Sequence, residues 1–331
     1  MLTAYVLFFA LILLFLALDL GVFHRNAHVI AMGEAVRWTL VWIGVALAFN
    51  ALVYVAYEAH WFGLGLDVPQ LDGTIAPVVS GWEAAKLFLT GYLVEKSLSL
   101  DNVFVISLIF GSLAVPAVYQ HRVLFWGILG ALLMRGAMVA VGAQLIHQYA
   151  WVPMVFGGLL VLTALKMAFM GSAPVDPTTH PVLRLIRRVV PVTAQYEGPR
   201  FLSRIGARRA VTPLFLALVL VEITDLVFAL DSIPAIFAIT ADPFLVLTSN
   251  VFAILGLRAL YFCLAGSIDR FRYLKPALIA ILAFVGVKML LVQTPLKVDP
   301  TVSLLVIAGI LTTAIVASAV VSRRGGKTVA A

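Results

Sequence analysis

Long apolar stretches alternate with short polar ones along the whole chain. A helix needs about 20 mostly apolar residues to cross roughly 30 Å of hydrocarbon. Nine stretches come near this length, at about 2–20, 36–57, 84–112, 122–144, 151–170, 213–239, 244–266, 275–292 and 302–321. The pattern therefore predicts an all-α polytopic membrane protein with about nine transmembrane helices. Residues 2–18 lack a basic leader and an A-x-A cleavage site, so we expect them to be a retained helix.

Composition supports a membrane protein. Hydrophobic residues make up 63% of the chain and charged residues 12%, whereas soluble domains carry about 25% charged residues. The net charge of +7 does not indicate nucleic-acid binding, because seven arginines lie in the single loop 171–212. The one cysteine, Cys263, excludes an internal disulfide. No nucleic-acid partner is expected, and the lipid bilayer is the predicted environment.

Basic residues predict the orientation. Loops rich and poor in Lys and Arg alternate along the chain, and cytoplasmic loops carry the excess. The N-terminus is then outside and the C-terminus cytoplasmic, in a bacterial inner membrane. In loop 171–212, residues 182–190 place three arginines on one helical face. An interfacial helix on anionic lipid and a regulatory or partner-binding segment are both open interpretations.

Two acidic segments resemble each other. LSLDNVFVI at 98–106 matches FALDSIPAI at 228–236, which aligns Glu95 with Asp225 and Asp101 with Asp231. Further matches align Arg135 with Arg258 and Lys166 with Lys288. The third to fifth and sixth to eighth spans thus form two three-helix units. Because three is odd, the second unit enters from the opposite side, as in transporters with inverted repeats.

The repeat also divides the chain. The predicted parts are two N-terminal helices (1–60), a first repeat (84–170), a basic cytoplasmic loop (171–212), a second repeat (213–292) and a last helix with its cytoplasmic tail (302–331).

Acidic side chains inside these spans are costly, at about 2.5–3.5 kcal/mol each if they faced lipid. We therefore expect them to face one another, a cation or trapped water. Residues six apart on a straight helix point about 120° apart, so each pair of acids diverges. Either the helices surround a wide polar centre, or each helix loosens near its aspartate. Pro234 favours loosening in the span at 213–239.

Carboxylate, amide and hydroxyl oxygens suit Mn²⁺, Mg²⁺ and Ca²⁺ alike. The four aligned acids therefore predict a divalent-cation site near mid-membrane. Further candidate ligands are Asp19, Asn50, Ser97, Thr224 and Ser232. The alternative is a set of ion pairs that holds the helices together. Candidate counter-charges for it are Lys96, Arg135, Lys166, Arg258 and Lys288.

Three segments resemble a known family. GYLVEKSLSLDNVFV (91–105), LVEITDLVFALDSIPAIFAITADPF (220–244) and LTSNVFAILGLRALYF (247–262) are similar to the TerC family of bacterial integral membrane proteins, with the Alx-type manganese exporters as the nearest branch. The resemblance implies export of Mn²⁺ from the cytoplasm. It also implies a metal site at Glu95, Asp101, Asn102, Glu222, Asp225 and Asp231. The resemblance is not assigned for loop 171–212 or for the tail after Arg323.

The sequence thus predicts a secondary transporter and not an enzyme. No G-x-x-x-x-G-K-[ST] loop is present for ATP, and the Y-D and G-x-G-D pair of intramembrane aspartyl proteases is missing. Proton antiport is a hypothesis, since crowded carboxylates can exchange a metal ion for protons. The alternatives are a membrane metallochaperone that delivers Mn²⁺ to exported proteins, and an exporter of another divalent or organic cation.

Overall fold

The computed structural model describes the chain except for residues 19–30, 170–180, 207, 265–272, 295 and 326–331. It consists mainly of α-helices: α1 (Leu2–Leu18), α2 (Met32–Glu58), α3 (Gly81–Ser112), α4 (Ala117–Gln148), α5 (Val152–Phe169), α6 (Pro181–Val189), α7 (Pro213–Phe237), α8 (Pro243–Leu255), α9 (Leu257–Leu264), α10 (Leu274–Leu290) and α11 (Pro300–Gly325). Two short antiparallel hairpins join them, β1 (Leu66–Pro69) with β2 (Ile75–Val78), and β3 (Leu202–Ile205) with β4 (Arg208–Val211).

Helices occupy the ranges of all nine predicted spans, and the helical polytopic class is confirmed. Among the described residues, five helices are long and apolar enough to cross a membrane: α2, α4, α5, α7 and α11. A sixth span results if α8 and α9, which meet at a 40° bend, count as one. Helices α1 and α10 have 17 residues each, and α3 carries five charged residues. The count of nine spans stays a prediction.

Side-chain caps fix where the central helices begin. The Ser80 hydroxyl accepts from the Glu83 amide at 3.2 Å at the start of α3. Thr212 caps α7 in the same way, and Asp242 caps α8 by accepting from the Phe244 amide at 2.9 Å. Capping satisfies backbone N–H groups that have no partner inside the helix. Proline follows Thr212 and Asp242, at a position where its missing N–H costs nothing.

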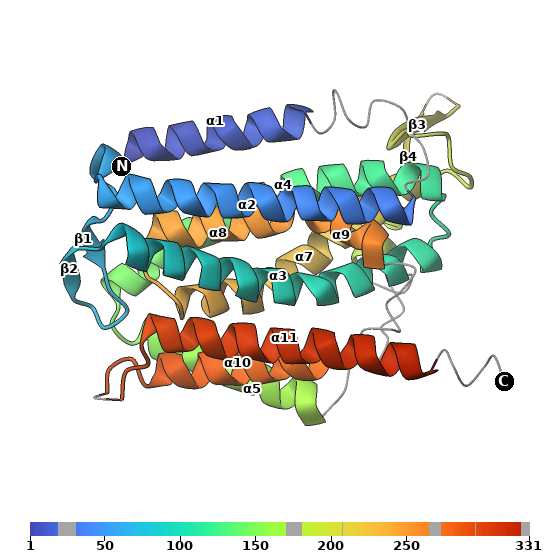
Figure 1. Cartoon of the computed structure of the whole chain (residues 1–331). Helices are drawn as coiled ribbons and strands as arrows, with labels where there is room; N and C mark the ends of the chain where they lie inside the picture. The colour runs from blue at the N-terminus through green and yellow to red at the C-terminus, as the bar shows by residue number, and fades with distance from the viewer. Residues whose placement is uncertain (19–30, 170–180, 207, 265–272, 295, 326–331) are drawn as a thin grey trace.

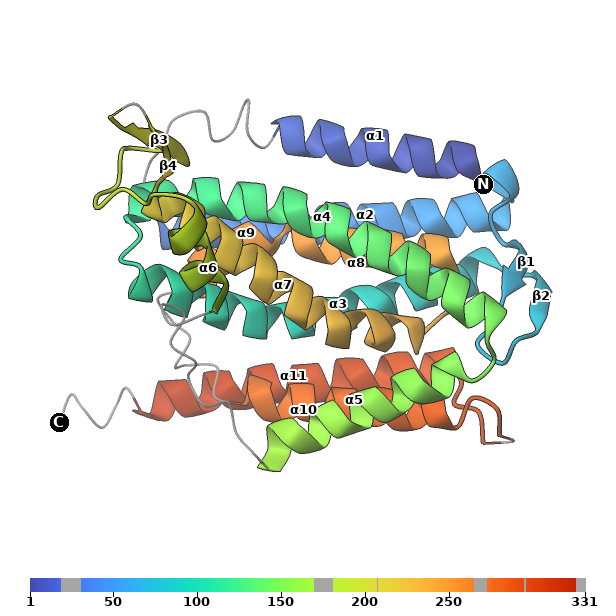
Figure 2. The ribbon, with the colours of Figure 1, turned by 180° about the vertical axis from the view of Figure 1, so that it is seen from behind.

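The long helices run alongside one another, as Figures 1 and 2 show. The N-terminus and the β1–β2 hairpin lie at one end of the bundle, and the β3–β4 hairpin and the last turn of α11 lie at the other. Helices α5, α10 and α11 form one group, which packs against α3 and α7. Gly157 and Gly286 let α5 and α10 touch, because a Cβ at Gly157 would lie 2.9 Å from the Gly286 carbonyl oxygen.

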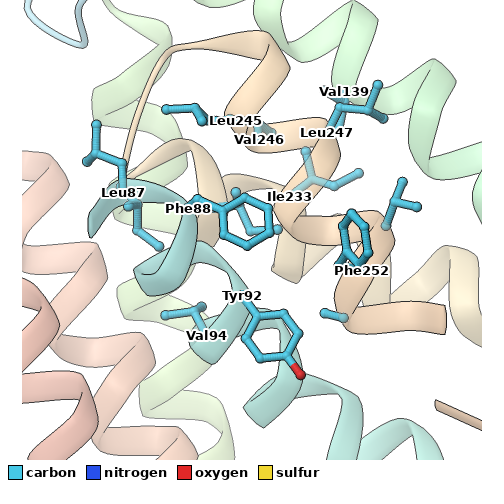
Figure 3. Packing of buried hydrophobic residues seen from close by; sticks show 14 of the residues in the cluster. Leu87, Phe88, Tyr92, Val94, Val139, Ile233, Leu245, Val246, Leu247 and Phe252 are labelled. Carbon is cyan, nitrogen blue, oxygen red and sulfur yellow. The ribbon is translucent and has the colours of Figure 1, made fainter. Parts of the chain in front are cut away.

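The apolar core is dense between α3, α4, α7 and α8. Figure 3 shows Phe88 and Tyr92 of α3 packed with Ile233 of α7 and Phe252 of α8. Both acidic helices run unbroken through their motifs, including Pro234 in α7. The predicted loosening is therefore not seen there. The interruption lies instead at Gly256, between α8 and α9.

Candidate ion site

A buried arginine lies at the centre of the molecule. Arg135 of α4, 1% exposed, contacts Glu95 of α3 and Asp225 of α7. Its Nη2 lies 2.8 Å from Asp225 Oδ1 and its Nε 3.1 Å from Oδ2, a two-point contact. Its Nη1 donates to Glu95 Oε1 and, at 3.1 Å, to the Ser232 hydroxyl. Three helices thus join their charges at one point, which we call the Arg135 cluster (Glu95, Arg135, Asp225 and Ser232).

The charges of the Arg135 cluster do not cancel. One guanidinium faces two carboxylates, so with all three groups ionised one negative charge is in excess. An uncompensated charge is costly away from water. The arrangement can therefore take up a cation or a proton.

Asn102 extends the cluster along α3. Its Nδ2 lies 3.4 Å from Asp225 Oδ1, while its own Oδ1 is buried and bonds to nothing within the described residues. Glu95 Oε2 is buried and unbonded in the same sense. A buried oxygen without a donor costs about 1–3 kcal/mol. These two atoms are thus available as ligands for a hard cation.

A small hollow of about 20 Å³ adjoins Asp225, which is room for about one water molecule. Its polar lining comes from Asn102, Thr224, Asp225 and Arg258, and its apolar lining includes Leu124 and Val221. Because Leu124 and Val221 precede Arg135 and Asp225 on helices that start at the β3–β4 end, the hollow extends from Asp225 towards that end.

The other predicted acids lie away from the cluster. Asp231, six residues beyond Asp225, accepts from the Thr163 hydroxyl of α5 at 3.1 Å. Asp101 is half-buried on α3, within electrostatic reach of Lys275. Glu222 lies against α4, where a Cβ at Gly130 would fall 2.0 Å from its carboxylate. The structure therefore brings together one acid from each motif, and the 120° divergence turns their mates elsewhere.

The remaining candidates are spread over the bundle. Lys96 donates from Nζ to the Ala253 carbonyl at 3.1 Å, beside the Gly256 break. Arg258 lines the hollow, Lys166 is exposed, and Lys288 is half-buried. Thr224 lines the hollow, the Ser97 hydroxyl donates to its own helix at Leu93, and Asn50 keeps a buried unbonded Oδ1 within the described residues. Asp19 falls outside the described residues.

Sequence reasoning missed two polar residues inside the helices. Thr163 holds Asp231, and Asn250 is a buried amide on α8. A polar residue in an otherwise apolar run was the available signal for both. Across the described residues, no three His, Cys, Asp or Glu side chains gather to hold a metal ion. The candidate site instead combines two carboxylates with one amide.

Comparison with known proteins identifies the family. A model described as "Integral membrane protein TerC family" matches residues 80–326. An uncharacterized membrane protein of Myxococcus xanthus, STKORF319, is 47% identical over 316 residues, covering 96% of this chain and 92% of its own. Alx of Escherichia coli K12, whose name proposes a membrane-bound redox modulator, is 42% identical over 321 residues, covering 97% and 95%.

A membrane protein of Rickettsia felis is 38% identical over 315 residues, covering 95% of this chain and 97% of its own. No solved structure matches the chain. The family match covers the cluster, the hollow and the acids Asp101, Glu222 and Asp231, but not Asp19. The chain belongs to the TerC family of integral membrane proteins.

Proposed function

We propose that the protein is a secondary transporter that exports Mn²⁺ from the cytoplasm through the Arg135 cluster. The proposal is carried by two buried oxygens, Glu95 Oε2 and Asn102 Oδ1, that bond to nothing in the described part of the chain. They lie beside the Asp225 carboxylate and its hollow. Carboxylate and amide oxygens are ligands that Mn²⁺ accepts. We assign Glu95, Asn102 and Asp225 to the central site.

Arg135 sets the electrostatics of binding. It supports the empty site by neutralising one of two carboxylates. A divalent ion there needs both carboxylates, so Arg135 moves away from at least one of them as the ion arrives. When the ion leaves, the carboxylates are neutralised again, either by the returning Arg135 or by protons. Proton antiport is the coupling that we propose.

The other three acids belong to the path on either side of the centre. Asp101 follows Glu95 towards the β3–β4 end, while Asp231 follows Asp225 towards the β1–β2 end. Glu222 precedes Asp225 near Gly130. We assign Asp101 and Glu222 to the approach of the ion, and Asp231 to its release.

The contacts between helices support an inverted repeat and nine spans. If α3, α4 and α5 correspond to α7, α8–α9 and α10, a two-fold axis would make α3 pack on α8 as α7 packs on α4. Both contacts are present, and α5 packs on its own counterpart α10. The seven loop arginines are all exposed at the β3–β4 end, which we place in the cytoplasm of an inner-membrane protein.

Two other functions are less well supported. A redox role, which the name of the Alx relatives suggests, would in a dithiol–disulfide cycle need two cysteines, and this chain has one. A metallochaperone that hands Mn²⁺ to exported proteins needs an ion site that a partner can reach. The Arg135 cluster is buried between three helices. Export of another divalent or an organic cation would use the same residues. The competition experiment below distinguishes it from export of Mn²⁺.

Flux in reconstituted vesicles tests the proposal. The wild-type protein should move Mn²⁺ across the membrane, and Glu95→Gln with Asp225→Asn should abolish this flux while the protein stays in the membrane. Asp72→Asn is the matched control, because it neutralises a carboxylate on the β1–β2 hairpin side. Normal flux in the double variant would overturn the site. Competition with Ca²⁺, Mg²⁺ and arginine identifies the cargo, and collapse of the pH gradient tests coupling.

A further inference from the structure

Within the described residues, the hollow lies on the β3–β4 side of the Arg135 cluster. It is lined by Asn102 of α3, by Gly127 of α4, by Thr224 and Asp225 of α7, and by Arg258 of α9. All of these helices belong to the two repeat units. If the two units are an inverted repeat, the residues that line this hollow have counterparts that form a corresponding region on the other side of the cluster. We call this the mirror region.

The repeat alignment locates the mirror region. Glu95 aligns with Asp225, and Arg135 aligns with Arg258. The same two sequence offsets give an aligned counterpart for each polar residue and for the glycine that line the hollow. These mirror residues are Val94, Glu95, Arg135, Ser232 and Asn250, which stand for Thr224, Asp225, Arg258, Asn102 and Gly127. Glu95 and Arg135 belong to the cluster itself, and Val94 on α3 and Ser232 on α7 lie on its β1–β2 side.

The mirror region is closed in this structure. Val94 is fully buried among the core residues of Figure 3. Gly91, which stands for the hollow-lining Val221, approaches α8 so closely that a Cβ would lie 2.7 Å from the Ser249 hydroxyl. The same helices thus leave space on one side of the cluster and close it on the other.

The closed mirror region gives the buried amide of Asn250 no hydrogen-bond partner among the described residues. Asn250 is 1% exposed, and neither its amide nitrogen nor its amide oxygen bonds to anything within the described residues. Leaving such a group unpaired costs about 1–3 kcal/mol per atom. Its counterpart Gly127 lines the open hollow. Asn250 therefore occupies the position that would line an open hollow on the other side.

We infer that the protein has a second, outward-facing cation site lined by Glu95, Arg135, Ser232 and Asn250, which opens towards the β1–β2 end when the hollow beside Asp225 closes. The inference rests on the proposed function and names the exit half of its path. Glu95 belongs to both states. The Asn250 amide oxygen supplies a hard ligand for a partly hydrated divalent cation, and its amide nitrogen can donate to a carboxylate or to water.

Thiol accessibility in the full chain tests this. The starting protein carries Cys263→Ser, which removes the single cysteine. Asn250→Cys and Val94→Cys report the outward site, and Thr224→Cys reports the hollow. Ala46→Cys is the buried control, on α2 outside both repeat units. Each variant is treated with a membrane-impermeant maleimide, from outside in intact cells and from the cytoplasmic side in inverted vesicles.

We expect Asn250→Cys and Val94→Cys to react from outside about tenfold or more faster than Ala46→Cys, since thiol reactivity follows exposure. Thr224→Cys should react from the cytoplasmic side. If Asn250→Cys does not insert, Val94→Cys decides, because it changes an apolar side chain of similar size. Lack of outside reaction at both, or reaction of both from the cytoplasmic side, would overturn the second site.

Labelling does not require manganese flux, so the two proposals can fail separately. Two-sided accessibility in a protein that moves no Mn²⁺ would reject manganese export and keep the outward site for another cation. Normal Mn²⁺ flux of the Cys263→Ser protein, with no outside reaction at Val94→Cys and Asn250→Cys, would reject the outward site alone.

Discussion

Two ion pairs of this protein lie in opposite environments. Arg135 meets Glu95 and Asp225 where all three are almost fully buried. Lys297 meets Asp72 near the β1–β2 hairpin, where their side chains are 57% and 20% exposed. The strength of an ion pair therefore differs between the two places. Water and salt weaken the outer pair, whereas an unpaired charge in the buried cluster has no water to solvate it.

The outer pair can only link two segments, whereas the buried cluster can also bind a cation or a proton. The outer pair joins the β1–β2 hairpin side to the segment between α10 and α11, and either partner alone can be hydrated. With its three charged groups ionised, the buried cluster carries one more negative than positive charge. Its member Glu95 and its neighbour Asn102 each keep an oxygen that bonds to nothing within the described residues. Holding the helices together does not by itself require this excess of negative charge. We expect substitutions to show the contrast directly.

The largest effect should follow removal of the central cation. Arg135→Met leaves two carboxylates buried without a partner, and breaking such a pair costs about 3–5 kcal/mol. Unfolding of the purified protein in lipid nanodiscs, followed by heat or denaturant, measures the loss. Adding Glu95→Gln and Asp225→Asn to Arg135→Met should restore much of it, because no charge is then left alone. Wild-type stability of Arg135→Met would contradict the buried cluster.

The next effect separates the two aspartates of α7. Asp225→Asn removes a carboxylate that we assign to the ion. Mn²⁺ affinity should fall by about 10–100-fold or more, since even groups that only support metal ligands are worth that much. Asp231→Asn should cost less affinity, because Asp231 bonds only to Thr163 among the described residues. Titration of Mn²⁺ into both variants makes the comparison. An equal loss would mean that the two acids share one site.

The sequence predicted helices at nearly the right positions because apolar runs of about 20 residues leave few alternatives in lipid. It also paired Glu95 with Asp225 through the repeat. It could not tell which acids would meet, since this depends on how far α3 and α7 are rotated against each other. Asp101 and Asp231 are aligned as well as Glu95 and Asp225, yet they face other helices.

The role of Arg135 was likewise open from the sequence. Five basic residues were equally available as counter-charges, and only packing selects among them. Lys96, next to Glu95 in the chain, points to the Ala253 carbonyl instead. The cause is the break at Gly256, which frees that carbonyl from the regular helical ladder. The sequence indicated a proline break at Pro234, where α7 in fact continues.

A buried contact with one neutral partner should give an intermediate effect. Tyr57 donates from its hydroxyl to Asp242 Oδ2 at 2.7 Å, and both residues are buried. Tyr57→Phe keeps the ring but leaves that oxygen without its donor, at a cost of about 1–3 kcal/mol. Asp242 still caps α8 through Oδ1, so the helix itself should remain. The denaturant midpoint measures the change, with Tyr54→Phe on the exposed side of α2 as the control.

The smallest effect is expected at the outer pair. Hydrogen bonds from Lys297 and Thr74 lower the pKa of Asp72 to about 2, while its unfolded value is about 3.9. The contact therefore stabilises the protein above about pH 4, and this contribution is lost as the pH falls towards 2. Because the pair is exposed, the gain is about 0.2–1 kcal/mol and shrinks with salt.

Asp72→Asn tests that last point. The variant should match the wild type in stability at pH 2 and fall slightly below it at pH 7, and high salt should close the gap. Denaturant unfolding at both pH values and at low and high salt measures it, with Asp67→Asn on the same hairpin as the control. A loss at pH 7 as large as that of Arg135→Met would mean that exposure does not separate the two pairs, and the contrast between them would fail.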